Sequence, residues 1–308
     1  MSVAPAPLLD TDLAASLLPV RDPRGHKGTF GRVSVVAGSL DFAGAALMSG
    51  AAALRAGSGL VTLWLPASLQ PLLAGRIPEL ITRGLPERST SQVDPAAAAD
   101  LILASAHDAL LVGPGMAPGP GSSGLVQRLL AADGPPAVVD AGALDALSGI
   151  PGWAGRVRRP CVLTPHPGEL QRLGRMPGST DEDRLAAARA AAAAWGQVVV
   201  LKGAQTVIAE PGGRTLLAPF SLPLLGTAGS GDVLAGVIAS FIGQGLAAFE
   251  AAALGVYLHA HAAERLGEEL GDAGLMATDL LDQIPRARRA LRDRGTGERP
   301  GPDQVRGR

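Results

Sequence analysis

Residues 225–236 are the stretch of this chain best suited to chemistry, because three glycines within six residues directly precede a long apolar run. Gly226, Gly229 and Gly231 allow a sharp turn and a close approach of the backbone to a ligand. The apolar run predicts a helix, whose amino terminus offers free N–H groups and a positive dipole end to an anion. Asp232 lies in the first turn of that helix. A bare carboxylate would repel a bound phosphate, so Asp232 suits a base facing a substrate hydroxyl or a partner for a phosphate-bridging metal. The alternative is a glycine-rich turn with Asp232 as an ordinary helix-start residue.

Glycine or polar residues also follow five apolar runs elsewhere in the chain. These motifs are Gly38-Ser39, Gly113-Pro114-Gly115, Asp140-Ala141-Gly142, Thr164-Pro165-His166-Pro167-Gly168-Glu169 and Lys202-Gly203. Each motif alone is a weak signal, because glycine often follows a strand. A mostly parallel sheet gathers the carboxyl ends of its strands at one edge, where ligands bind. The five motifs together therefore predict a ligand site at that edge.

Lysine is rare in this chain, since Lys27 and Lys202 are the only two among 27 basic residues. Both precede glycine, so a compact ammonium that reaches phosphates is one interpretation and chance is the other. His166 lies between Pro165 and Pro167, which fix its backbone. This rigid imidazole indicates either the positioning of a polar ligand or a surface turn.

The remaining histidines and the single cysteine do not suggest a metal or nucleophilic site. His259 and His261 are two residues apart in an expected helix and do not share a face, so we interpret them as packing or interface residues. Cys161 begins an apolar strand and is interpreted as a core residue. No Cys/His cage is present, and no residue is predicted to be a metal ligand. A Walker phosphate loop and a Gly-x-Gly-x-x-Gly dinucleotide fingerprint are also absent.

Composition limits the class of protein. The chain has 308 residues, 47% of them apolar, and a formal net charge of −1. This balance argues against a nucleic-acid partner or a polybasic membrane anchor. Residues 1–18 lack a basic region followed by a continuous apolar stretch, so no signal peptide is expected, and no apolar run is long enough to span a bilayer. With one cysteine, no internal disulfide can form. We therefore expect a cytoplasmic protein.

Alternating strands and helices predict an α/β fold with a mostly parallel central sheet. Strands are expected at residues 33–37, 60–65, 79–82, 109–112, 137–140, 161–164, 197–201, 207–210 and 214–217. Helices are expected at residues 10–18, 44–56, 95–106, 124–132, 181–195, 233–244, 247–266 and 278–293, with a loop at 118–123. The chain is expected to comprise an arm at residues 1–24, one domain at 25–293 and a disordered tail at 294–308.

Several motifs together resemble one known family. Thr227-Ala228-Gly229-Ser230-Gly231-Asp232 resembles the anion hole of the ribokinase-like superfamily. With the Lys27-Gly28-Thr29-Phe30-Gly31, Pro165–Glu169 and Lys202–Thr206 motifs, the chain is similar to the ADP-dependent (S)-NAD(P)H-hydrate dehydratases from about residue 17 to residue 292. The resemblance implies a three-layer α/β/α fold and a dehydratase without the epimerase domain that many relatives carry.

The resemblance also implies an activity and a site. The substrate would be the S-form of hydrated NADH or NADPH, ADP would donate a phosphoryl group, and Mg²⁺ would bridge the nucleotide phosphates. Asp232 would be the base. The hydrated dinucleotide would contact Ala45, Ala46, Gly115, His166 and Asp232, and the adenine nucleotide would contact Lys202, Gly203, Ala204, Gln205, Thr206, Gly229, Ser230 and Gly231. Members of the family tend to be tetramers, so a homotetramer is expected.

Two other functions remain open from the sequence. One is a small-molecule kinase of the same superfamily that phosphorylates an alcohol, such as a thiamine precursor. The other is a non-catalytic nucleotide sensor on the same fold. The choices between ADP and ATP and between hydrated NADH and hydrated NADPH also stay open.

Overall fold

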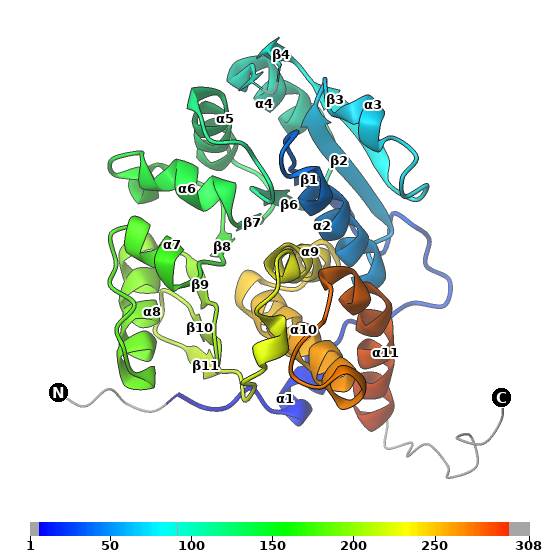
Figure 1. Cartoon of the computed structure of the whole chain (residues 1–308), viewed down its shortest axis with the longest axis vertical. Helices are drawn as coiled ribbons and strands as arrows, with labels where there is room; N and C mark the ends of the chain where they lie inside the picture. Colours follow the sequence, from blue (N-terminus) through cyan, green and yellow to red (C-terminus); the bar gives the residue numbers. More distant parts are fainter. Residues whose placement is uncertain (1–5, 91, 296–308) are drawn as a thin grey trace.

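A nine-stranded sheet forms the centre of the molecule (Figure 1). The computed structural model describes residues 6–90 and 92–295. In spatial order the strands are β11 (Thr215–Leu217), β10 (Val207–Ala209), β9 (Val198–Leu201), β8 (Cys161–Leu163), β7 (Ala137–Val139), β6 (Ala109–Val112), β1 (Arg32–Val36), β2 (Leu60–Pro66) and β3 (Ile81–Leu85). All pairs from β9 to β3 are parallel, whereas β10 pairs antiparallel with β9 and β11. The predicted mostly parallel sheet is confirmed.

The central strands are apolar throughout because both faces of the sheet are covered. All four residues of β6 are buried. Leu111 belongs to one hydrophobic cluster, while Leu110 and Val112 belong to a second one. Since successive side chains of a strand point to opposite faces, the two clusters are two cores, one on each side of the sheet.

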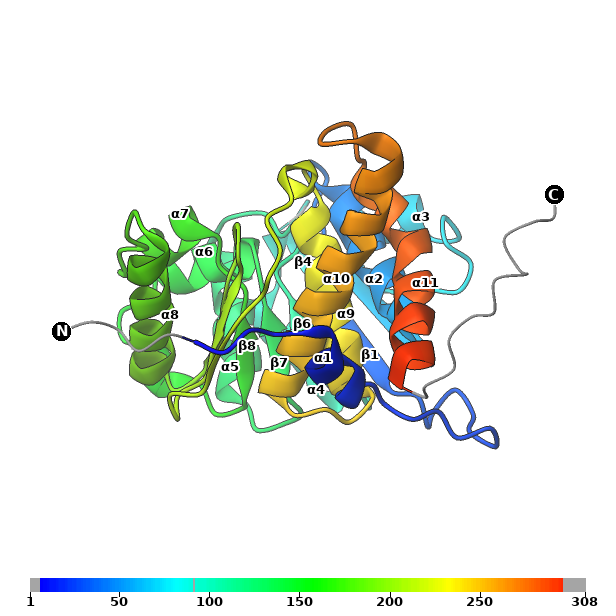
Figure 2. The same ribbon diagram turned by 90° about the horizontal axis from the view of Figure 1, so that it is seen from below.

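Helices form the two outer layers of the predicted α/β/α arrangement. Helices α2 (Ala43–Ala56), α9 (Ser230–Gly243), α10 (Ala248–Leu270) and α11 (Ala277–Gly295) contribute to the first core, and α4 (Pro95–Ala104), α5 (Pro120–Ala131), α6 (Gly142–Ser148), α7 (Pro167–Arg172) and α8 (Asp181–Trp195) to the second. Figure 2 shows α9, α10 and α11 on one side of the sheet and α6, α7 and α8 on the other. The smaller elements are α1 (Thr11–Ser16), α3 (Gln70–Leu73), β4 (Glu87–Ser89), β5 (Gln92–Val93) and the 3-10 turns η1 (Trp153–Arg156) and η2 (Pro223–Leu225).

Some predicted element boundaries differ from the structure. The expected loop at 118–123 is wrong from residue 120 onward, because α5 begins at Pro120. Proline suits the first turn of a helix, where its missing N–H has no role. The expected strand at 79–82 lies at Ile81–Leu85 as an edge strand, where pairing with β2 holds the polar residues of β3 in the sheet. Short helices such as α6 and α7 have no counterpart in the prediction.

The described part of the amino-terminal arm packs on the sheet. Leu9 and Ala14 are fully buried in the first core. The Leu9 N–H donates to the Leu217 carbonyl, and the Leu217 N–H donates to the Pro7 carbonyl, at 2.9 and 3.0 Å. These bonds cover the free edge of β11, which would otherwise offer unpaired backbone groups. The proposed domain boundaries remain a prediction, and residues 296–308 of the predicted tail lie outside the described residues.

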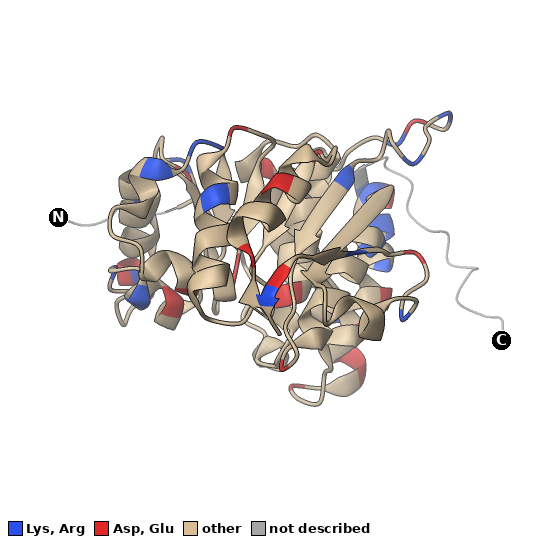
Figure 3. Cartoon of the chain, turned by 90° about the horizontal axis from the view of Figure 1, so that it is seen from above, with Lys and Arg blue, Asp and Glu red and all other residues tan. Residues whose placement is uncertain are grey.

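The distribution of charged residues and the hydropathy of the helices agree with the expectations from the composition. Acidic and basic positions are interspersed along the ribbon (Figure 3). Within residues 6–90 and 92–295, no helix is both long and apolar enough to cross a membrane.

Candidate functional site

The amino terminus of α9 carries Asp232 at the carboxyl-end edge of the sheet. The helix begins at Ser230, and Gly229 caps it with φ +88°. A side chain at Gly229 would also meet Met48 of α2, since an added Cβ would lie 2.6 Å from the Met48 Cε atom. The left-handed backbone favours glycine here, whereas the flexible end of the Met48 side chain could move aside.

Lys202 connects the α9 terminus to two buried carboxylates. Its Nζ atom lies 2.8 Å from Asp140 Oδ1 and 3.6 Å from Glu169 Oε2. Thr164 Oγ1 donates to the same Asp140 oxygen at 2.7 Å. A Cβ added at Gly231 would lie 3.4 Å from Lys202 Nζ, so the ammonium is adjacent to the first turn of α9. Three strand-end motifs and the glycine-rich turn thus meet at one place, as the sequence predicts.

Burial and charge together set the protonation of this cluster. Asp140 is 1% exposed and Glu169 is 5% exposed. Burial alone would lower the pKa of Lys202, but the Asp140 and Glu169 carboxylates outweigh it and raise that pKa, so the ammonium stays charged. Burial raises the pKa of Glu169, against the opposing effect of Lys202.

Asp232 has a pKa suited to proton transfer near neutral pH. Burial, followed by the negative charge of Asp140, raises its pKa from 3.8 to about 7, while Lys202 acts in the opposite direction. A base is most effective when its pKa lies near the working pH. Strongly shifted groups in a cleft are also candidates for functional residues.

His166 is the N-cap residue of α7, and its side chain is half exposed. Its Nδ1 atom accepts from the Gly168 N–H at 3.0 Å and from the Glu169 N–H at 3.4 Å. The Glu169 side chain accepts in return from the His166 N–H at 2.7 Å, which completes a capping box. Because Nδ1 accepts, the ring proton of neutral His166 is on Nε2.

A pocket of about 660 Å³ opens beside the cluster, a size typical of small-molecule sites. Six of the predicted nucleotide residues line it: Lys202, Gly203, Ala204, Thr206, Ser230 and Gly231. His166 also lines it, as do apolar residues that include Phe220, Leu222, Leu225 and Leu234. Gln205, Gly229 and Asp232 do not belong to its wall. One end of the pocket is thus charged, and the rest is largely apolar.

The predicted residues Ala45, Ala46 and Gly115 form a separate group. A Cβ added at Gly115 would lie 2.8 Å from the Ala45 Cβ atom and 2.5 Å from the Phe42 carbonyl oxygen, so Gly115 packs directly on the start of α2. Ala46 is fully buried, with no exposed surface. Since Met48 of α2 contacts Gly229, this group lies next to the Asp232 helix rather than in the wall of the 660 Å³ pocket.

Sequence reasoning missed part of the site. Asp140 and Glu169 were named only within strand-end motifs, although the concentration of carboxylates at those ends was a usable signal. His259, interpreted as a packing or interface residue, lines the pocket and lies 2.9 Å from the Ser230 carbonyl through Nε2. A carbonyl only accepts, so this nitrogen carries the proton, and burial lowers the pKa of His259 to about 4. Lys27 does not join the site, because it packs on Gly59 at the amino end of β2.

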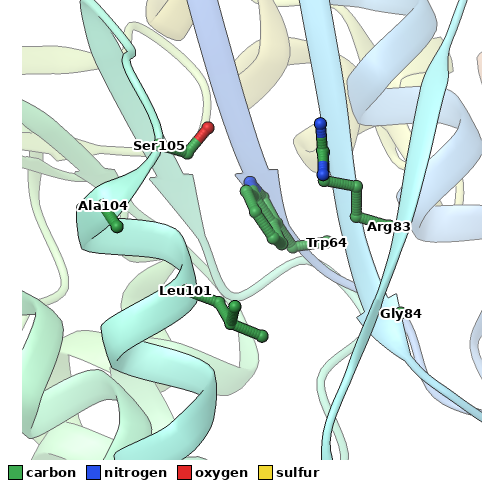
Figure 4. A pocket seen from close by; sticks show the side chains of 6 residues that line it. All are labelled: Trp64, Arg83, Gly84, Leu101, Ala104 and Ser105. Atoms are coloured by element: carbon green, nitrogen blue, oxygen red, sulfur yellow. The ribbon is translucent and has the colours of Figure 1, made fainter.

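A second open pocket, of about 510 Å³, lies beside the edge strand β3 (Figure 4). Trp64 and Arg83 line it, with the Arg83 guanidinium 5.8 Å from the centre of the Trp64 ring. The other lining residues are Gly84, Leu101, Ala104 and Ser105. This lining holds no carboxylate and none of the predicted site residues, so it is not the candidate site.

Comparison with known proteins supports the motif-based resemblance. A model of the family described as NAD(P)H-hydrate dehydratase matches residues 33–286. The chain belongs to this family. It is 43% identical over 288 residues to the bifunctional NAD(P)H-hydrate repair enzyme Nnr of Moorella thermoacetica, covering 93% of this chain and 54% of that protein. The chain thus spans about half the length of the first curated relatives that it matches.

Relatives of similar length also belong to this dehydratase family. The ADP-dependent (S)-NAD(P)H-hydrate dehydratase of Xanthomonas campestris is 37% identical over 289 residues, covering 91% of this chain and 96% of the relative. Among solved structures, the ADP/ATP-dependent NAD(P)H-hydrate dehydratase of Bacillus subtilis, co-crystallized with ATP/Mg²⁺, superposes with a TM-score of 0.82 at 33% identity. That match covers 94% of this chain and 100% of the other. The predicted family and ribokinase-like fold are confirmed.

Proposed function

We propose that this chain is a hydro-lyase that restores NADH and NADPH from the S-forms of their hydrates, using ADP and releasing AMP and phosphate. The observation that carries the proposal is the position of Asp232. Its carboxyl group, with a pKa of about 7, lies at a helix amino terminus that borders a 660 Å³ pocket. Membership in the dehydratase family supports the same assignment.

The first proposed step is phosphorylation of the substrate. Asp232 accepts the proton of the ring hydroxyl while that oxygen attacks the terminal phosphorus of ADP. The bond between this phosphorus and the bridging oxygen breaks, and AMP leaves. N–H groups at the start of α9, from Gly229 to Gly231, stabilise the negative charge on the transferring group.

The second proposed step is elimination. Hydroxide is a poor leaving group, whereas phosphate is a good one. The carbon–oxygen bond of the phosphorylated ring breaks, phosphate departs with the former hydroxyl oxygen, and loss of a proton restores the nicotinamide double bond. This order explains why a dehydration would need a nucleotide.

Residue roles follow the geometry and the family resemblance. The segment from Lys202 to Thr206, with Ser230 and Gly231, would hold the adenine nucleotide in the 660 Å³ pocket. Ala45, Ala46 and Gly115 would contact the hydrated dinucleotide on the other side of Asp232, and His166 would contact it from the wall of the 660 Å³ pocket. Since Ala46 has no exposed surface, its contribution would be to shape the start of α2.

Mg²⁺ would accompany the nucleotide. In the part of the chain that the structure describes, no group of three or more His, Cys, Asp or Glu side chains is placed to hold a metal. Mg²⁺ commonly keeps several waters and binds largely through substrate phosphates, so the phosphates of the nucleotide would supply its main ligands. The ion would neutralise charge on the phosphates. We further propose a cytoplasmic homotetramer, as the family resemblance implies.

The proposal is tested by incubating the chain with hydrated NADH and ADP and following the absorbance band of reduced nicotinamide. Recovery of NADH with equal amounts of AMP and phosphate is expected. A small-molecule kinase would instead release a stable phosphorylated alcohol. Parallel assays with ATP and with hydrated NADPH determine the preferred nucleotide and substrate.

A further inference from the structure

Arg184 of α8 lies behind the loop that begins at Lys202. Its Nη1 donates to the Ala204 carbonyl, and its Nη2 donates to the Lys202 carbonyl at 3.4 Å. The side chain is 13% exposed and also lies 3.6 Å from Asp181. Arg184 Nε is among the buried side-chain nitrogens of the described residues without a hydrogen-bond partner. The guanidinium thus binds the two loop carbonyls even though its Nε–H is left without a partner.

Gly203 lies in the chain between the Lys202 and Ala204 carbonyls, and Arg184 packs directly against it. Its φ of +143° favours glycine, and an added Cβ would lie 2.6 Å from Arg184 Nη2. The loop is fixed further along, where Gln205 adopts φ +50° and its N–H donates to the Phe220 carbonyl at 2.7 Å. The loop conformation therefore depends on glycine at 203 and on a cation behind it.

The other side of the loop faces the pocket. Gly203 and Ala204 both line it. Among the described residues, neither of their N–H groups donates to a backbone carbonyl. Successive free N–H groups of this kind form a typical binding site for an anion.

The peptide geometry connects these two sides. The Lys202 carbonyl that accepts from Arg184 belongs to the same peptide group as the Gly203 N–H. A cation on the oxygen of an amide withdraws electron density from its nitrogen, so the N–H becomes a stronger donor. Arg184 can therefore act on a ligand that it does not touch.

We propose that Arg184 is a positioning residue that orients and polarises this loop for a phosphate group of the nucleotide, an inference that rests on the proposed function. Removal of its charge weakens the hydrogen bonds from the loop to phosphate oxygens. Binding of adenosine, which has no phosphate, does not depend on these hydrogen bonds. The expected signature is a loss of affinity that depends on the phosphates of the ligand.

The test measures the binding of ADP and of adenosine to three variants by calorimetry. Where a ligand binds too weakly for direct titration, its affinity is measured by competition with the tighter ligand. Arg184→Gln should bind ADP about tenfold more weakly and adenosine within about twofold of the unaltered chain. Arg184→Lys keeps the charge but not the planar guanidinium. Its affinity for ADP should lie between those of Arg184→Gln and the unaltered chain. Arg189→Gln is the matched control, because Arg189 lies on the same helix and donates to Thr215 instead.

Two results would overturn the inference. One is unchanged ADP binding in Arg184→Gln, and the other is an equal loss for ADP and adenosine, which would mean that Arg184 only maintains the fold of the loop. Absence of ADP binding by the unaltered chain would instead reject the proposed function, and this inference with it.

Discussion

Lys202 Nζ lies 2.8 Å from Asp140 Oδ1, and both groups influence the carboxyl group of Asp232. Asp140 raises the pKa of Asp232, and Lys202 lowers it. The two residues, which are 62 positions apart in the chain, thus shift the pKa of the proposed base in opposite directions.

Replacing Asp232 by asparagine should remove the base without changing the size of the side chain. We expect the turnover rate to fall by about 10²- to 10⁴-fold, the usual contribution of a general base. Binding of ADP should persist, because the free N–H groups of α9 remain. Steady-state assays and calorimetry measure the two effects. A variant that retains full turnover would show that Asp232 is not the base.

Asp140→Asn should shift the titration of Asp232 to lower pH. The charge of Asp140 favours the protonated form of Asp232, so its removal lets the carboxyl group ionise more easily. The titration is followed by carbon NMR of the Asp232 carboxyl in the nucleotide-free protein, where the unaltered chain should titrate near pH 7.

The matched control for this titration is Asp145→Asn. Asp145 is nearby in the chain but pairs with Arg172 at a half-exposed position. It should leave the Asp232 titration unchanged. Equal shifts in Asp140→Asn and Asp145→Asn would contradict a specific role for Asp140.

Asp232→Asn should also stabilise the fold at neutral pH. The folded-state pKa of about 7 lies above the ordinary value of 3.8, so the folded chain binds the proton more tightly than the unfolded chain. The associated stability is present below pH 4 and is lost as the pH rises towards 7. Asparagine cannot ionise, so the variant should be more stable by on the order of 2 kcal/mol at pH 8. Denaturant unfolding at pH 8 and pH 4 tests this, and the gain should vanish at pH 4.

Gly115→Ala and Gly152→Ala separate backbone strain from close packing. Both glycines have nearly the same positive φ, +64° and +66°. A Cβ at Gly152 meets nothing within 4 Å, whereas one at Gly115 meets the Phe42 carbonyl oxygen at 2.5 Å. Gly152→Ala should therefore lower the free energy of unfolding by about 1 kcal/mol, the cost of a left-handed residue.

Gly115→Ala should lower the free energy of unfolding further and should raise the KM for the hydrated dinucleotide, with the KM for ADP unchanged. The physical reason is the displaced start of α2, which lies outside the wall of the 660 Å³ pocket. Unfolding curves and the two KM values provide the comparison. Equal effects of both substitutions would reject a role for Gly115 beyond its backbone conformation.

Several features of the fold were readable from the sequence because they depend on local pattern. Apolar runs such as Ala109–Val112 identify strands buried on both faces, and the turn at Gly229 marks the start of α9. Short elements were not readable. Helix α7 has six residues, and its amino-terminal capping group is a histidine rather than the common serine, threonine or aspartate.

The candidate site was predictable in place but not in its pairings. Glycine and polar residues at strand ends indicate the edge of the sheet at which these motifs meet in the structure. The contact of Lys202 with Asp140 depends on which strands become neighbours in the sheet. The hydrogen bonds from Arg184 to the loop that begins at Lys202 depend on the packing of α8. No regular spacing in the sequence predicts either of these two contacts.

The most direct test of the proposed mechanism follows the substrate hydroxyl oxygen. Hydrated NADH prepared in ¹⁸O-labelled water carries the label in its ring hydroxyl, and the reaction with ADP is then run in ordinary water. Transfer of the phosphoryl group to that hydroxyl followed by elimination places one ¹⁸O atom in the released phosphate, which mass spectrometry detects. Recovery of NADH with unlabelled phosphate would contradict the account, because the hydroxyl would then have left without ever being phosphorylated.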